Sequence, residues 1–322
     1  MGKLMERIGK YVIHTAVVTT GYSRVFLCHD PDLQVPVAAK LFDPKPGDDS
    51  LLSPAQQLSR FLTEVRTLAS FDHPYIVGVK TLEHLADGRP YFVMPYMAAH
   101  LPYEIGKDFP TAEAAAAASE RDRPRRMNGS RAMLVMKQLS SAVLALHKRG
   151  LVHRFLKPSN VLLSATQNGA VKLCDFSLIK LAEKNLPLPG FWMGDAAYTA
   201  PEQMENATAV DSRADVYSLG VLAYRLLIGG LPDLSVPAVL PGGFPEQLAA
   251  LVAACTDPDP SRRPPHAGDV LGALDRVPAP SRPAAAKPTV QVVASKPRPQ
   301  TPAAETSGAE APAAQPVAAK SR

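Results

Sequence analysis

Cysteine is scarce in this sequence, with only three in 322 residues. Cys28, Cys174 and Cys255 lie far apart and form neither a CxxC pair nor a Cys/His ligand spacing, so they indicate neither a disulfide framework nor a zinc site. We expect buried, reduced thiols. Long apolar runs are also missing: none reaches the roughly 18 residues of a membrane-spanning helix, and no signal-peptide core opens the chain. These absences predict a soluble cytoplasmic protein with no membrane partner.

A strong charge of one sign is missing from most of the chain. The formal net charge is +5, but residues 278–322 contain six basic residues against two acidic ones and therefore carry +4 of it. The remainder is close to neutral, at about +1, so the high isoelectric point does not argue for nucleic-acid binding. We expect no nucleic-acid partner.

Large apolar residues are nearly absent from residues 278–322, which are rich in Pro and Ala. Such a segment cannot bury enough surface to offset its ordering entropy, so we expect a disordered tail. Its KPRPQTP stretch at 296–302 matches a PxxP ligand, although Pro-rich linkers are commoner than recognised motifs. A second biased segment, TAEAAAAASERDRPRRMNG, predicts an exposed insertion at about 110–129 that holds at most a short alanine helix.

The first part of the chain has the alternation and turn signals of β-strands. Strands are expected at 11–18, 23–30 and 35–42, and a further one at 91–97. Between them, Ser53 followed by Pro54 and Gln56 provides an N-cap, a first-position proline and a capping box, which predict a helix start. Apolar residues then recur at helical spacing on one face of that helix, namely Leu58, Phe61, Leu62, Val65 and Leu68.

The later part of the chain has helical periodicity. Met136, Leu139, Val143 and Leu146 form a stripe that ends at Gly150, and residues 215–230 form an almost wholly apolar helix ended by two glycines. Strands first and helices second predict an α+β fold of two lobes with a cleft between them. The expected division is an N-terminal extension at 1–10, a small lobe at 11–97 and a helical lobe at 98–277.

Seven short features follow one another in a characteristic order. They are VAAK (37–40), Glu64 on the capped helix, HRFLKPSN (153–160), DFS (175–177), APE (200–202), DVYSLG (215–220) and DPSRRP (259–264). In order and spacing they resemble the signature set of protein kinases, in the style of bacterial Ser/Thr kinases, over residues 11–277. The resemblance implies the two-lobed kinase fold, with a small β-rich lobe and a larger helical lobe, and ATP and Mg²⁺ as cofactors.

The resemblance also implies roles for individual residues. Lys40 would bridge the α- and β-phosphates and pair with Glu64, and Lys157 would meet the γ-phosphate. Asn160 and Asp175 would supply oxygen ligands to Mg²⁺, a hard cation that needs few protein ligands.

Other parts of the resemblance concern the adenine and the packing of the site. Met94 and Met97 border the strip between the lobes where backbone groups hold adenine, and Met97 could donate its N–H because Pro95 has none. His153 and Phe176 are expected to be packing residues.

The pattern breaks first at the catalytic loop. The family has an aspartate there that handles the proton of the substrate hydroxyl, and this chain has Phe155. A phenyl ring can neither accept nor orient that proton, and general-base assistance is typically worth about 10²- to 10⁴-fold in rate. Phosphoryl transfer depends largely on positioning and charge stabilisation, so the loss is compatible with a slow enzyme as well as an inactive one.

The pattern breaks again at the loop over the phosphates. Aligning Val25 with the valine of the motif places Val18, Thr20 and Ser23 where three glycines are expected, with Gly21 out of step. Glycines let the backbone approach phosphate oxygens closely, so this loop should hold phosphate less well. Ser177, in place of the glycine after Asp-Phe, is a milder change.

Three features of the second half also depart from the family. No Ser, Thr or Tyr occurs at 178–197, so activation by phosphorylation there is not expected. Asp195 stands where the family has a threonine that hydrogen-bonds the catalytic aspartate. Between 226–230 and 244–252 about a dozen residues remain, too few for the helix that usually docks protein substrates.

Three hypotheses follow from this combination. The first is a pseudokinase that binds ATP and Mg²⁺ and acts as a regulatory or scaffolding partner of another protein. The second is an active Ser/Thr kinase with a protein substrate, in which Asp195 leans into the gap at Phe155 and pairs with Lys157 as a substitute carboxylate. The third is a binding module that holds no nucleotide.

Overall fold

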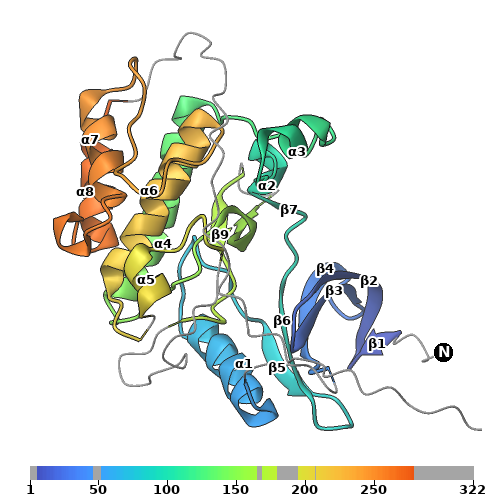
Figure 1. Cartoon of the computed structure of the whole chain (residues 1–322). Helices are drawn as coiled ribbons and strands as arrows, with labels where there is room; N and C mark the ends of the chain where they lie inside the picture. The colour runs from blue at the N-terminus through green and yellow to red at the C-terminus, as the bar shows by residue number, and fades with distance from the viewer. Residues whose placement is uncertain (1–5, 46–51, 165–168, 180–194, 207, 279–322) are drawn as a thin grey trace, which may run out of the picture.

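The structure is a computed structural model that describes residues 6–45, 52–164, 169–179, 195–206 and 208–278. A β-sheet with one helix lies at one end of the molecule, and a group of helices lies at the other (Figure 1). The α+β, two-lobed architecture expected from the sequence is confirmed. The tail at 279–322 and most of the segment expected to lack hydroxyls, 180–194, fall outside the described residues.

The small lobe is built on an antiparallel sheet of six strands in the order β1-β2-β3-β4-β6-β5. The strands are β1 (Arg7–Ile8), β2 (Tyr11–Thr19), β3 (Ser23–Asp30), β4 (Val35–Phe42), β5 (Thr81–His84) and β6 (Pro90–Pro95). The three early strands are confirmed. The strand expected at 91–97 ends two residues sooner, because Pro95 has no N–H to extend the ladder.

The residues before Tyr11 belong to the small lobe instead of extending from it. Ile8 pairs with Tyr11 in the β1–β2 ladder and is fully buried. It joins a core with Phe26, Val37 and Tyr91 on one face of the sheet. The boundary expected at residue 11 therefore lies earlier in the structure.

Helix α1 (Pro54–Ala69) begins as its sequence predicts. The Ser53 hydroxyl accepts a hydrogen bond from the Gln56 N–H, and the Gln56 side chain accepts one from the Ser53 N–H, at 3.3 and 2.9 Å. Two of the helix's unsatisfied N-terminal donors are thereby used. The apolar face of α1 then packs on the sheet, with the Phe61 ring centroid 5.6 Å from that of Phe42 and 5.5 Å from that of Phe92.

The helical lobe surrounds α6, which is buried along almost its whole length. Its elements are α2 (Pro102–Ile105), α3 (Ala112–Ala117), α4 (Gly129–His147), α5 (Pro201–Glu205), α6 (Ser212–Ile228), α7 (Glu246–Cys255), α8 (Ala267–Arg276), the 3₁₀ turns η1 (Pro158–Asn160) and η2 (Pro260–Arg262), and a sheet of β7 (Ala99–His100), β8 (Val161–Leu163) and β9 (Val171–Leu173). None of the described helices is both long and apolar enough to cross a membrane.

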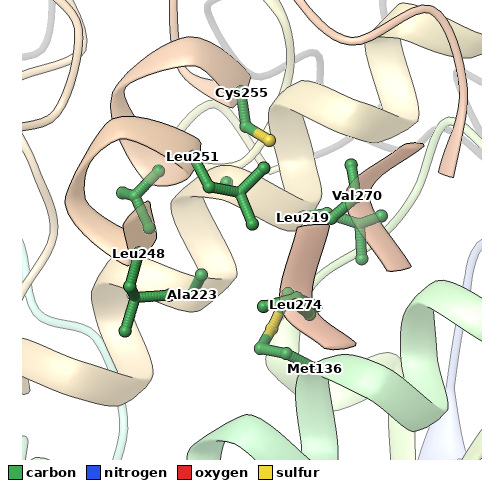
Figure 2. Close-up of a pocket in the computed structure, with 10 residues that line it drawn as sticks. Met136, Leu219, Ala223, Leu248, Leu251, Cys255, Val270 and Leu274 are labelled. Atoms are coloured by element: carbon green, nitrogen blue, oxygen red, sulfur yellow. The ribbon is translucent and has the colours of Figure 1, made fainter. Parts of the chain in front are cut away.

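Helices α4, α6, α7 and α8 meet around a small apolar gap (Figure 2). Met136, Leu219, Leu248 and Leu274 contribute side chains to its lining. Gly220 allows α6 to approach the end of α7, because a Cβ there would lie 2.6 Å from the Cβ of Cys255. Buried packing of this kind provides a rigid base for the loops at the cleft.

The biased insertion forms the short helix α3 and is tied to the lobe on both sides. Gly106 has φ +75°, and a Cβ there would meet the backbone oxygen of Arg123 at 1.9 Å. The Arg125 N–H donates to the Ile105 carbonyl at 2.8 Å, and the fully buried Arg225 of α6 donates to the same carbonyl at 3.1 Å. The insertion is thus anchored, although much of its side-chain surface is exposed.

The stretch between α6 and α7 contains no helix, and it is described throughout. Gly229 ends α6 in the left-handed conformation, and turns then lead to Glu246. Val236 and Val239 are 50% and 76% exposed there. The helix that the sequence is too short to hold is absent from this stretch.

Candidate functional site: a nucleotide cleft

The centre of the cleft is an ion pair between β4 and α1. Nζ of Lys40 lies 2.7 and 2.8 Å from the two carboxylate oxygens of Glu64. Both side chains are buried, at 9% and 2% exposed. Burial by itself would lower the pKa of Lys40, but the negative charges of Glu64 and Asp175 outweigh it and raise that pKa. The pair requires α1 to be docked against the sheet.

Asp175 reaches the same pair from the end of β9. Its Oδ1 lies 4.0 Å from Nζ of Lys40, and it accepts a hydrogen bond from the Ser177 N–H at 3.3 Å. Burial would raise the pKa of this carboxyl, but Lys40 and Ser177 lower it below its ordinary value. The residue has φ +61°, a left-handed conformation that costs about 1–3 kcal/mol outside glycine. The carboxylate is therefore ionised and held in a strained backbone position.

Phe176 and His153 pack under this carboxylate, as expected. Both are fully buried, and their rings meet edge to face with centroids 5.0 Å apart. Burial lowers the pKa of His153. Because its imidazole is neutral and enclosed, His153 fits a packing role and not that of a ligand.

Asp215 of α6 anchors the loop that contains His153 and Arg154. Its carboxylate accepts hydrogen bonds from the N–H groups of His153 and Arg154, both at 2.8 Å, and from Nε2 of His147 at 2.9 Å. Asp215 is completely buried. The sequence places Asp215 in a kinase motif but predicts no role for it. The available signal was an acidic residue within an otherwise apolar helix.

Phe155 and Lys157 contact each other on this loop. The ammonium of Lys157 sits over the ring of Phe155, 4.5 Å from its centroid. Asn160 is close by, and its Nδ2 donates to the Phe155 carbonyl at 2.8 Å. Since Nδ2 is used in this way, Oδ1 is the atom of Asn160 that could serve as a metal ligand.

The loop over the cleft is closed by its own hydrogen bonds. The Thr20 N–H donates to the Ser23 carbonyl at 2.8 Å, and the Ser23 N–H donates to Oγ1 of Thr20 at 3.1 Å. Backbone N–H groups that are used in this way are not available to phosphate oxygens, which glycine-rich loops bind through such groups. Gly21 is exposed between them, and Val18 is 49% exposed and faces Val25 across the β2–β3 pair.

A protein-family model described as the protein kinase domain matches residues 13–236. The chain belongs to the protein kinase family. It is similar to serine/threonine-protein kinase PknL of Mycobacterium tuberculosis, at 32% identity over 276 residues, which is 79% of this chain and 62% of PknL. It is also similar to the PknA kinases of Corynebacterium glutamicum, at 30% over 291 residues, 85% of this chain and 58% of that protein.

A third relative is the DNA damage-responsive serine/threonine-protein kinase RqkA of Deinococcus radiodurans, at 34% identity over 229 residues, 70% of this chain and 30% of RqkA. The bacterial Ser/Thr kinase type expected from the motifs is thereby confirmed. The kinase domain described above spans less than two thirds of the length of each of these relatives.

The hinge of this kinase fold follows β6. Met94 pairs with Ala38 of β4 and packs against the main core, and Met97 follows the end of the strand. Val25 of β3 pairs with Lys40. Met94 and Val25 therefore lie on the two strands that flank β4, which bears Lys40, and Met97 lies just beyond β6. Their contact with adenine stays a prediction.

Among the residues that the structure describes, Asp195 hydrogen-bonds to those of its own segment and not to Lys157. Its carboxylate accepts from the Ala197 N–H at 3.2 Å, and its carbonyl accepts from the hydroxyl of Thr199 at 2.8 Å. In the described part of the chain no ion pair joins Asp195 to Lys157. A role for Asp195 as a substitute carboxylate stays a prediction.

Tyr22 is a feature of the site that the sequence analysis missed. It stands at the tip of the closed loop, half-buried, with its ring 6.3 Å from that of Phe42. Burial and the nearby charge of Glu64 raise its pKa to about 12. The available signal was an aromatic residue between Gly21 and Ser23, inside the motif of the phosphate loop.

The oxygen donors present fit a hard divalent cation. Asp175 offers a carboxylate and Asn160 an amide oxygen, and among the described residues no group of three or more His, Cys, Asp and Glu forms a metal cage. Mg²⁺ suits such a sparse set because it keeps several waters and completes its octahedron with phosphate oxygens. Lys40 supplies the positive charge that a nucleotide's phosphates would need.

Proposed function

We propose that this kinase-family chain binds ATP and Mg²⁺ in its cleft but transfers phosphate weakly or not at all. It would act as a pseudokinase, a nucleotide-responsive regulatory or scaffolding partner of another protein. The observation that carries the proposal is the pair of Phe155 and Lys157, where a ring occupies the place of the proton-handling carboxylate.

The binding half of the proposal is supported by the buried charges. Lys40 is held by Glu64 within hydrogen-bonding distance, and Asp175 is ionised 4.0 Å away. Mg²⁺, when bound, would neutralise charge on the phosphates. Lys40 would then orient the nucleotide, and Asp175 with Asn160 would hold the cation in place.

The transfer half of the proposal is supported by what the cleft lacks. Phe155 has no group that accepts a proton. Among the described residues, no carboxylate is hydrogen-bonded to Lys157 in its place. The substrate-docking helix is absent from the described stretch between α6 and α7. A partner protein would therefore be held by a surface without being phosphorylated.

Thermal unfolding with ATP, with and without Mg²⁺, tests the binding half. A ligand at 100 times its Kd adds about 2.7 kcal/mol of stability, which raises the Tm measurably. We expect a rise with ATP that is larger when Mg²⁺ is present. No rise at millimolar ATP would leave the third hypothesis, a binding module without nucleotide, which the closed loop around Thr20 favours.

A second candidate is an active Ser/Thr kinase that uses Asp195. It is favoured by the docked pair of Lys40 and Glu64 and by the similarity of the chain to serine/threonine-protein kinases. Phosphate transfer by wild type, Phe155→Asp, Asp195→Ala and Asp175→Ala separates the candidates. Activity in wild type that is lost in Asp195→Ala, with ATP binding intact, would establish the active kinase. Activity in Phe155→Asp alone would support the pseudokinase.

A further inference from the structure

We propose that Phe155 is a positioning residue, which holds the ammonium of Lys157 over its ring and so presents that charge to the terminal phosphate of a bound nucleoside triphosphate. The inference rests on the proposed nucleotide binding. It assigns a role in binding to a residue that otherwise marks only the loss of catalysis.

The geometry of the loop brings the two side chains together. Leu156 lies between the two residues in the chain and is 1% exposed in the core, whereas Phe155 and Lys157 are both half-exposed. Lys157 itself is extended, with φ −157° and ψ 163°. Phe155 and Lys157 thus face away from the core, where the 4.5 Å contact forms.

The backbone of Phe155 is held at both of its polar groups. Its N–H donates to Nδ1 of His153 at 3.2 Å, and its carbonyl accepts from Nδ2 of Asn160 at 2.8 Å. Because His153 is fully buried and Asn160 is 6% exposed, these partners are themselves fixed. The ring thus has a defined base from which to hold Lys157.

A ring and a carboxylate act differently on an ammonium group. A cation within about 6 Å of a ring centroid is attracted by the ring's quadrupole, but its charge is not cancelled. In the described residues Lys157 has no ion-pair partner that would cancel it. The full charge therefore remains for an anion in the cleft, and the phosphate most affected is the one that ADP lacks.

The test compares ATP and ADP binding by calorimetry, with Mg²⁺, in three single variants and one double variant. Phe155→Leu keeps apolar bulk and removes the ring, and we expect it to weaken ATP binding by about two- to fivefold and ADP binding by less. Phe155→Tyr keeps the ring and should match wild type. In a Lys157→Met background, Phe155→Leu should have no further effect. Equal losses for ATP and ADP, or a loss that persists without Lys157, would overturn the proposal.

A second measurement needs no nucleotide. After reductive ¹³C-methylation of the lysines, the Lys157 methyl signal, assigned by its absence in Lys157→Met, should be shifted upfield by the ring current. The shift should survive in Phe155→Tyr and vanish in Phe155→Leu. An unshifted wild-type signal would disprove the contact itself. A shifted signal with no ATP binding by wild type would instead refute the proposed function, and with it the presentation of Lys157 to phosphate.

Discussion

Two sets of residues in the candidate site differ in what they keep. In the first set, Lys40 and Glu64 form a buried ion pair, and the carboxylate of Asp175 lies 4.0 Å from Lys40. In the second set, the Thr20 loop hydrogen-bonds to itself, and Phe155 stands where a carboxylate would act. The first set holds charged groups in place. In an active kinase, the positions of the second set would provide a flexible loop over the phosphates and a carboxylate that accepts the substrate's proton. The difference indicates that binding a nucleotide and transferring its phosphate have separate structural requirements.

The largest effect is expected from breaking the buried ion pair. Lys40→Met leaves the carboxylate of Glu64 in a site 2% exposed without its ion-pair partner, which should lower the free energy of unfolding by about 3–5 kcal/mol. Adding Glu64→Gln should recover most of the loss. Urea denaturation at pH 7 measures both, and Lys107→Met, at an exposed pair with Asp122, is the matched control that should change nothing measurable. A mild effect of Lys40→Met would contradict the pair's burial.

A smaller effect is expected from removing the charge of Asp175. Asp175→Asn should abolish the extra stabilisation that Mg²⁺ adds to ATP, out of the roughly 2.7 kcal/mol available at 100 times Kd. Asp87→Asn, on the exposed β5–β6 turn, should leave it intact. Thermal shift with and without Mg²⁺ decides the point. If Mg²⁺ raised the Tm in ATP equally for Asp175→Asn and wild type, Asp175 would not be a ligand of the metal.

The pH dependence of this binding follows from the lowered pKa of Asp175. A carboxyl with a depressed pKa stays ionised until the pH falls through that lowered value, so its contribution is present above it and lost below it. The difference in Mg²⁺-dependent ATP binding between wild type and Asp175→Asn should therefore stay constant from pH 8 to 5, because the terminal phosphate of ATP, with a pKa of about 6, titrates equally in both. A difference that declines with a midpoint near pH 6 would show that another protein group governs the site.

The smallest effect is expected from opening the loop. Thr20→Gly removes the hydroxyl that accepts from the Ser23 N–H, at a site where glycine is the family residue. One net hydrogen bond is worth about 1 kcal/mol, so ATP affinity should rise by about fivefold. Thr15→Gly, at an exposed position of β2 ahead of the loop, is the control. Unchanged or weaker ATP binding in Thr20→Gly would show that the closed loop does not hinder phosphate.

The sequence predicted those features that depend on local chemistry. The capping box at Ser53 and the three early strands need only neighbouring residues, and the motifs with Lys40 and Asp175 carry the family's spacing. The fold and the retained ionic set therefore followed from the sequence.

Features that depend on long-range packing did not follow from the sequence. The place of Lys157 over Phe155 is set by how the loop is anchored on Asp215, and the docking of the insertion depends on the buried Arg225. The closed loop depends on hydrogen bonds between Thr20 and Ser23. The sequence shows that both residues are present but not that they bond to each other. Such contacts join residues whose positions only the assembled fold determines.

The most direct test of the central claim is a single-turnover experiment with γ-labelled ATP, Mg²⁺ and an excess of the wild-type protein. The account predicts that the label binds and that most of it is recovered hours later as intact ATP. Conversion of most of the bound label to ADP or labelled protein within that time by wild type, but not by Asp175→Asn, would show that the site transfers phosphate in spite of Phe155 and would contradict the account.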